Sequence, residues 1–183
     1  MTNQSQTKIN LDISEKQLED FLCSGKNLEK YLNLKFIARQ VAIPPIGIID
    51  ILAYHKDSNS WVVIELKKSN LDESAFCQLY SYLNFYKQTK SFIDIGHFQR
   101  TRKFSGLLIG SNLDNKLIKV VNFNNDCFNE DISYLLYNFS LDNGLQFTWR
   151  NMNQKYIENT LLSINNSNEQ KRYDILLKPI KTY

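Results

Sequence analysis

Apolar residues near the start of the chain recur at helical spacing. Leu18, Phe21 and Leu22 form one such stripe, which indicates an amphipathic helix. Ser14 and Gln17 fit the capping-box pattern, in which the two residues satisfy free backbone N–H groups at a helix start. We therefore expect the first helix to begin at Ser14.

The clearest helix is expected over residues 72–90, because its apolar side chains would share one buried face. Gln78 and Tyr82 are four residues apart and would project together from a neighbouring face, offset from the apolar stripe. This pair would either support a functional site or simply pack as a tyrosine beside a solvated glutamine. The apolar stripe itself consists of Ala75, Phe76, Leu79, Leu83 and Tyr86.

Short, almost continuous apolar runs predict strands that are covered on both faces. Residues 47–54 and 61–67 are two such runs, separated by a segment with the composition of a turn. They are interpreted as an antiparallel hairpin. Further strands are expected at 36–43, 104–109, 132–139 and 145–150, helices at 27–34, 112–121 and 156–164, a polar linker at 165–171, and a strand or tail at 173–179.

Charged residues interrupt the apolar runs of this hairpin at Asp50, Glu65 and Lys67. If Tyr54 pairs with Trp61 across the turn, Asp50 lies opposite Glu65, and all three charged side chains share one face. Two carboxylates in a partly buried site repel each other and lose hydration. A divalent cation would offset this cost, and hard oxygen ligands suit Mg²⁺ or Mn²⁺. Lys67 could then orient an attacking water or stabilise charge on a phosphate.

A surface hairpin with a simple Glu65–Lys67 salt bridge is the structural alternative. Surface hairpins alternate polar and apolar residues, whereas these charges interrupt runs that are apolar on both faces, which favours a site. The first helix offers a further acid. By helical angles, Glu15 lies about 70° and Glu19 about 105° from the centre of the apolar stripe, so Glu15 is expected nearer the buried edge. Glu15 would also stabilise the helix dipole without any site.

Net charge, cysteine spacing and the polarity of the chain bear on nucleic-acid binding, zinc or disulfide sites and membrane association. The net charge of +3 does not by itself indicate nucleic-acid binding, so any such contact needs a local patch. Cys23, Cys77 and Cys127 lack zinc-site or disulfide spacing and are expected to be buried or half-buried free thiols. The polar residues 1–10 and the lack of a long apolar run predict a cytoplasmic protein that does not associate with membranes.

The ordered set of motifs resembles the PD-(D/E)xK nucleases, in the RecB-like branch with a Gln-x-x-x-Tyr helix. The set comprises Asp50, Glu65-Leu-Lys67 and Gln78-x-x-x-Tyr82. Residues 14–22, Gly47-Ile-Ile-Asp50 and Glu65-Leu-Lys67 are similar, more narrowly, to the catalytic domain of the NucS/EndoMS endonucleases and their stand-alone relatives. This resemblance covers about residues 14–110.

The resemblance implies a fold and a set of roles. The fold would be α/β, with a restriction-endonuclease-like mixed central sheet flanked by helices, in a single domain over 1–183. Residues 111–183 would form a C-terminal extension of unassigned role. Catalysis would involve Asp50, Glu65, Lys67 and, from the first helix, Glu15, with Glu19 as the alternative acid. The metal ligands would be Asp50, Glu65 and the Leu66 carbonyl, and nucleic acid would meet Gln78, Tyr82 and Lys68.

The expected function is a Mg²⁺- or Mn²⁺-dependent endonuclease that hydrolyses phosphodiester bonds of DNA, duplex or branched. The resemblance does not extend to the separate N-terminal DNA-binding domain of NucS proteins, so it does not imply mismatch recognition. A homodimer is compatible with this interpretation. Two other classes remain: a catalytically silent nucleic-acid-binding or assembly module of the same fold, and a metal phosphatase acting on small substrates. The chain lacks a Gly-x-x-x-x-Gly-Lys loop, which disfavours the phosphatase.

Overall fold

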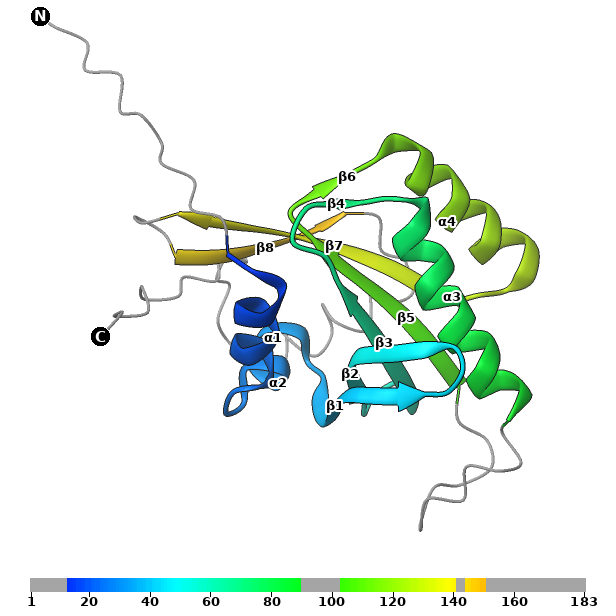
Figure 1. The fold of residues 1–183 in the computed structure, drawn as a ribbon, viewed down its shortest axis with the longest axis horizontal. Helices are drawn as coiled ribbons and strands as arrows, with labels where there is room; N and C mark the ends of the chain where they lie inside the picture. Colours follow the sequence, from blue (N-terminus) through cyan, green and yellow to red (C-terminus); the bar gives the residue numbers. More distant parts are fainter. Residues whose placement is uncertain (1–12, 90–102, 141–143, 151–183) are drawn as a thin grey trace, which may run out of the picture.

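The computed structural model describes residues 13–89, 103–140 and 144–150. Its centre is a six-stranded sheet with the strand order β1-β2-β3-β5-β7-β8, and helices cover both faces (Figure 1). The helices are α1 (Glu15–Cys23), α2 (Asn27–Leu32), α3 (Glu73–Gln88) and α4 (Asn115–Phe128). The strands are β1 (Lys35–Ile43), β2 (Gly47–His55), β3 (Ser60–Leu66), β4 (Asn70–Leu71), β5 (Lys103–Gly110), β6 (Asn112–Leu113), β7 (Ile132–Ser140) and β8 (Gly144–Arg150).

The sheet is mixed. β1, β2 and β3 are antiparallel neighbours, β3, β5 and β7 are parallel, and β8 returns antiparallel to β7. Of these parallel strands, β3 and β5 are buried along almost their whole length because both of their faces are covered. The expected mixed α/β fold with a central sheet and flanking helices is confirmed.

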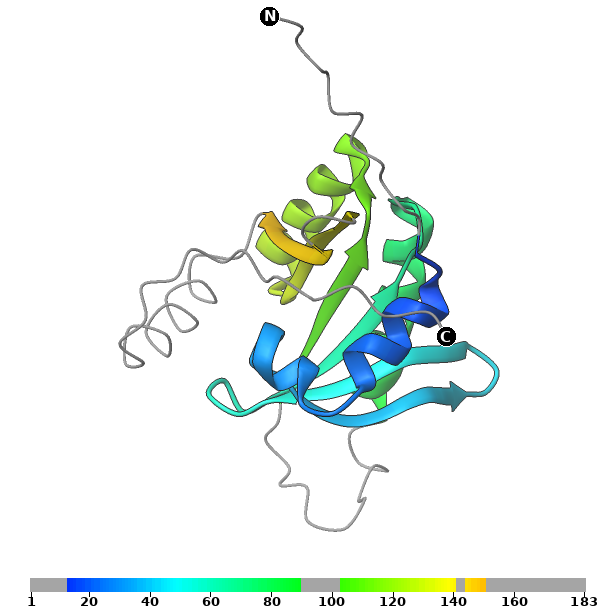
Figure 2. The same ribbon diagram turned by 90° about the vertical axis from the view of Figure 1, so that its left-hand side faces the viewer.

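Alternate side chains of the strands enter two separate cores. On one face, Ile51 and Ile64 pack with Leu18 and Leu22 of α1. On the other face, Val63 belongs to a second core, together with buried residues of α3 and α4 such as Leu79 and Leu117. The two views of the ribbon show the same division, with α1 and α2 on one side of the sheet and α3 and α4 on the other (Figures 1 and 2). Charged residues on β2 and β3 therefore lie between two apolar layers.

Side-chain caps fix the starts of α1 and α3. Ser14 caps α1, and its side chain and that of Gln17 form the expected capping box. Asp72 caps α3 by accepting hydrogen bonds from the backbone N–H groups of Ser74 and Ala75, both at 3.0 Å. These caps set the phase of α1 and α3, and so decide which of their side chains meet the strands.

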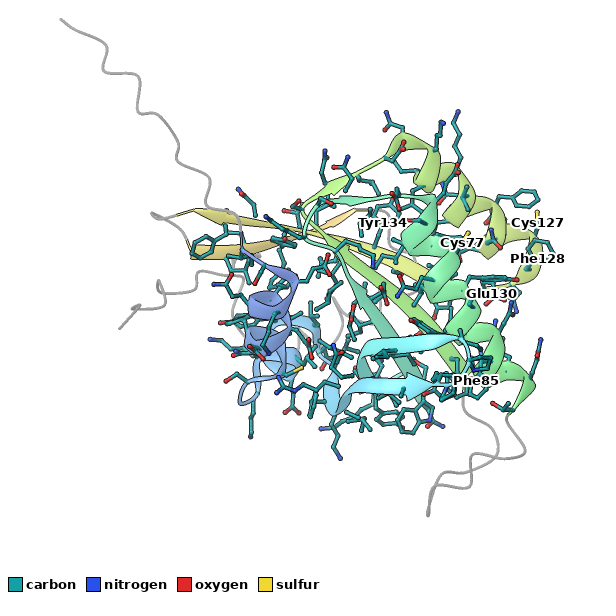
Figure 3. The ribbon with its side chains drawn as sticks, in the orientation of Figure 1. Cys77, Phe85, Cys127, Phe128, Glu130 and Tyr134 are labelled. Atoms are coloured by element: carbon teal, nitrogen blue, oxygen red, sulfur yellow. The ribbon has the colours of Figure 1, made fainter. Side chains whose placement is uncertain are left out.

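Three expectations about the fold need correction. α4 runs to Phe128 rather than ending near residue 121. The sequence did not reveal its last turns, because they carry exposed residues, including Phe123 and Phe128, and so show no apolar stripe. The short pair β4–β6 was not expected, since two residues per strand leave no readable pattern. Cys77 and Cys127 are exposed on α3 and α4 rather than buried (Figure 3), and only Cys23 is half-buried.

The helix expected at 156–164, the linker at 165–171 and the strand or tail at 173–179 lie outside the described residues. Among the helices that the structure describes, none is long and apolar enough to cross a membrane.

Candidate active site

The hairpin of β2 and β3 has the register that the sequence predicts. Tyr54 pairs with Trp61, and the antiparallel pairing continues to Ile51 and Ile64. The next position on β2 is Asp50. Its carboxylate Oδ2 accepts a hydrogen bond of 2.8 Å from the Leu66 backbone N–H, so the side chain, rather than the main chain, makes the next contact between the strands.

Glu65 is the most deeply buried charged group of the site, at 1% exposure. Its Oε1 accepts a hydrogen bond of 2.7 Å from Lys67 Nζ. Its Oε2 is buried, and none of the described residues forms a hydrogen bond with it. A buried carboxylate oxygen without a partner costs free energy, so this atom is suited to bind a positively charged ligand.

Burial dominates the electrostatics of the two carboxylates. It raises the pKa of Asp50, against the opposing hydrogen bond from the Leu66 N–H. It also raises the pKa of Glu65 to about 7, although the hydrogen bond from Lys67 opposes the rise. Burial alone would lower the pKa of Lys67, but the hydrogen bond and negative charge of Glu65 outweigh it and leave that pKa raised. The lysine therefore stays cationic. Keeping the two buried carboxylates ionised costs free energy, and a bound cation would offset that cost.

A chain of hydrogen bonds connects this lysine to α3 and back to β2. Lys67 Nζ donates to Gln78 Oε1 at 3.2 Å, and Gln78 Nε2 donates to Tyr82 Oη at 3.0 Å. Tyr82 Oη in turn donates to the Ile48 carbonyl at 2.8 Å. Gly47 permits this approach, because a Cβ at that position would lie 2.7 Å from Tyr82 Oη. The Gln-x-x-x-Tyr pair thus orients Lys67 from the helix side.

Tyr82 does not occupy the offset, less buried face that the sequence suggested. It is 1% exposed and belongs to the same core as Leu79 and Leu83. The reason is that the start of β2 lies against this side of α3, so that Tyr82 is covered by Gly47 and Ile48. Its hydroxyl is occupied by protein partners, and Gln78 is half-buried. Their contact with nucleic acid stays a prediction.

Both acids of α1 form hydrogen bonds near the hairpin, but their burial does not follow the order expected from helical angles. Glu15 is exposed, and its Oε1 accepts a hydrogen bond of 2.8 Å from the Lys68 backbone N–H, just beyond β3. Glu19 is the more buried of the two, at 8% exposure. The prediction that Glu15 lies nearer the buried edge was therefore wrong, because β1 covers Glu19 through Gln40, whose Nε2 donates to Glu19 Oε2 at 2.9 Å.

The chain after β3 is held firmly. The Lys67 N–H donates to the Ile109 carbonyl at 2.8 Å. The Lys68 carbonyl accepts hydrogen bonds from Ser111 Oγ at 2.9 Å and from Tyr137 Oη at 2.8 Å. The Lys68 side chain is exposed, as a phosphate contact would require. This anchoring gives the motif residues a fixed backbone.

One residue near the site was missed by sequence reasoning. Gln40 on β1 has a φ of 51° and hydrogen-bonds Glu19. Its amide is also one of the groups that hold down the pKa of Asp50 against burial. Nothing in the sequence around it signals a left-handed residue, because it lies in an ordinary strand-like run.

The site offers few ligands of its own to a metal. Among the described residues, no group of three or more His, Cys, Asp or Glu side chains is arranged to hold one. The available donors are the carboxylates of Asp50 and Glu65, with the Leu66 carbonyl as the further ligand expected from the sequence. Such an open oxygen set suits Mg²⁺, which usually keeps several waters and binds through one or two carboxylates.

Part of the chain is similar to known proteins. Residues 14–98 match the model of the Endonuclease NucS C-terminal domain. Endonuclease NucS of Methanocaldococcus jannaschii is 36% identical over 80 residues, which are 44% of this chain and 29% of that protein.

The fold is shared with a solved structure. A structure of an EndoMS–dsDNA2 complex has a TM-score of 0.50 at 21% identity, over 74% of this chain and 50% of that chain. A repair endonuclease from Pyrococcus abyssi has a TM-score of 0.47 at 21% identity, over 68% and 47%. The chain therefore spans half or less of the length of these relatives. Over the part that carries Glu15, Asp50, Glu65 and Lys67, it is similar to the NucS/EndoMS endonucleases.

Proposed function

We propose that this site hydrolyses phosphodiester bonds of DNA with the help of Mg²⁺ or Mn²⁺. The observation that carries the proposal is the buried Oε2 of Glu65, which no described residue satisfies, on the same hairpin face as Asp50 and Lys67. A surface salt bridge would leave both oxygens of the glutamate exposed to water, and it would need neither a second carboxylate nor burial.

Asp50, Glu65 and the Leu66 carbonyl would hold the cation, which would supply charge neutralisation and an activated water. The protein's own contribution is positioning. Glu65 and Gln78 hold Lys67 Nζ from two sides, at 2.7 and 3.2 Å. The lysine side chain is 25% exposed, so it can meet a phosphate at the surface while its position stays fixed. There it would stabilise the negative charge that develops in the transition state.

DNA as the substrate rests on similarity. The matched family is that of an endonuclease, and one structural relative is described as a complex with dsDNA. The similarity covers the part of the chain that holds the candidate site. The proposal therefore concerns cleavage of the phosphodiester bond and names no preferred DNA sequence. The exposed Lys68 next to the site would meet a DNA phosphate.

A metal-dependent nicking assay tests the proposal. Supercoiled plasmid and labelled single-stranded, duplex and branched DNA would be incubated with Mn²⁺, Mg²⁺ or EDTA. The variants are Asp50→Ala and, as a matched control on the same hairpin, Asp57→Ala, whose exposed carboxylate lies at the turn. We expect cleavage with Mn²⁺ or Mg²⁺ by the wild type and by Asp57→Ala, and none by Asp50→Ala or with EDTA.

The other outcomes identify the alternatives. DNA binding without metal-dependent cleavage would make the chain a silent nucleic-acid-binding module. In a parallel phosphatase assay with the same metals, hydrolysis of p-nitrophenyl phosphate without DNA cleavage would make it a metal phosphatase. Cleavage that Asp50→Ala retains in full would show that the activity does not come from this site.

A further inference from the structure

Gln40 has a backbone conformation that its position does not explain. It lies within β1 and has a φ of 51°, in the left-handed region that side chains with a Cβ rarely adopt. The other non-glycine residues with positive φ in the described ranges are Asn33, Asn59 and Asn129. These are asparagines at helix ends or in a turn, where that conformation is common. A left-handed glutamine inside a strand needs surroundings that hold it there.

The irregular residue faces the candidate metal ligand. The pairing of β1 with β2 joins Arg39 to Ile51 and Val41 to Ile49, which places Gln40 opposite Asp50. These two residues are left out of the regular pairing. Asp50 therefore lies at an irregular point of the pairing with β1, where side-chain interactions can set the orientation of its carboxylate.

Those interactions come from both neighbouring strands. On the β3 side, the Leu66 N–H donates to Asp50 Oδ2 at 2.8 Å. On the β1 side, Gln40 lies opposite Asp50, and its amide is one of the groups that lower the pKa of this carboxylate against the effect of burial. The same amide donates to Glu19 Oε2 at 2.9 Å. A side-chain amide has two N–H donors, so one glutamine can serve both carboxylates.

We propose that Gln40 is a positioning residue for Asp50, which fixes the orientation of this carboxylate for the cation and ties it to Glu19 of α1. The inference rests on the proposed function, since it assumes that Asp50 is a metal ligand. Residues that hydrogen-bond metal ligands orient them, and their loss typically weakens metal binding about 10- to 100-fold. The left-handed backbone at Gln40 is the means by which an exposed strand residue brings its amide between two carboxylates.

Calorimetric titration with Mn²⁺ tests this role. Gln40→Met keeps most of the side-chain volume but loses the amide. Gln40→Gly loses the amide and accepts a positive φ freely, so it separates the side chain from the backbone conformation. Asn129→Gly, at the end of α4, is the matched control for a positive φ elsewhere. We expect both Gln40 variants to bind Mn²⁺ about 10- to 100-fold more weakly, and the control to bind as the wild type does.

A second measurement separates positioning from folding. In cleavage assays the Mn²⁺ concentration for half-maximal rate should rise in both Gln40 variants, while the rate at saturating Mn²⁺ falls far less. Thermal melts should show that Gln40→Gly remains folded. Wild-type Mn²⁺ affinity in Gln40→Gly would overturn the inference and leave the proposed function intact. If the wild type itself binds no Mn²⁺ through Asp50, the proposed metal site fails, and the role of Gln40 fails with it.

Discussion

Replacing Glu65 by glutamine should stabilise the metal-free protein, and the gain should depend on pH. Burial raises the pKa of Glu65 from its ordinary 4.5 to about 7. Ionisation of the Glu65 carboxyl group is therefore less favourable in the folded protein than in the unfolded chain. Below pH 4.5 both states carry the neutral acid and no penalty exists. The penalty grows as the pH rises from 4.5 towards 7 and is complete above it.

The size of the effect follows from the same pKa values. The difference between 4.5 and about 7 corresponds to about 3 kcal/mol at 1.36 kcal/mol for each tenfold change in proton concentration. Glu65→Gln removes this penalty but also takes the ionic partner away from Lys67. We therefore expect the free energy of unfolding of the metal-free variant to exceed that of the wild type by about 1–3 kcal/mol at pH 8. At pH 4.5 the difference should be much smaller.

Urea denaturation in EDTA, repeated between pH 4.5 and 8, measures this difference. Glu73→Gln, in the exposed first turn of α3, is the matched control and should change the free energy of unfolding by less than about 0.5 kcal/mol. Saturating Mn²⁺ should reverse the order at pH 8, because the cation stabilises only a protein that retains the carboxylate. A stability difference that stays constant over the whole pH range would refute the claim that burial penalises the Glu65 carboxylate.

Two further predictions concern the contact between β2 and α3. Tyr82→Phe should lower the free energy of unfolding by about 1–2 kcal/mol, because the hydroxyl that bonds both Gln78 and the Ile48 carbonyl is lost. Gly47→Ala should cost about 1–3 kcal/mol, since its Cβ would meet Tyr82 Oη at 2.7 Å and the φ of 153° at this position favours glycine. The double variant should lose less stability than the sum of the two single-variant losses, because the phenylalanine side chain lacks the clashing oxygen. Urea denaturation measures these losses, and strictly additive values would contradict the contact between Gly47 and Tyr82 Oη.

The site's central geometry could be predicted because it follows from local rules. A turn between two apolar runs fixes the register of a hairpin, and the register decides which side chains share a face. The pairing of Tyr54 with Trp61, and with it the placement of Asp50 beside β3, needed no information from elsewhere in the chain. The capping box at Ser14 was equally local.

The features that were missed depend on how distant elements pack. The burial of Glu19 arises because β1 lies alongside α1, which no helical angle within α1 reveals. Tyr82 became a core residue because the start of β2 covers its side of α3. The left-handed Gln40 donates a hydrogen bond to Glu19 of α1 and lies opposite Asp50 of β2, so its own sequence neighbours give no sign of its conformation.

The central claim is that Lys67 acts on the transition state of phosphodiester cleavage. The direct test is the rate of DNA cleavage at saturating enzyme and Mn²⁺, in single turnover, for Lys67→Ala. Lys56→Ala, an exposed lysine near the turn of the same hairpin, is the control, and thermal melts with Mn²⁺ verify the fold.

Removing Lys67 should lower the cleavage rate about 10²- to 10⁴-fold while DNA affinity changes much less, because the lysine's role is in the transition state. Metal-free stability should also fall, since the lysine no longer offsets the repulsion between Asp50 and Glu65, and Mn²⁺ should restore it. Lys56→Ala should cleave at the wild-type rate. Cleavage at the wild-type rate by Lys67→Ala would make Lys67 a salt-bridge residue and would contradict the proposed mechanism.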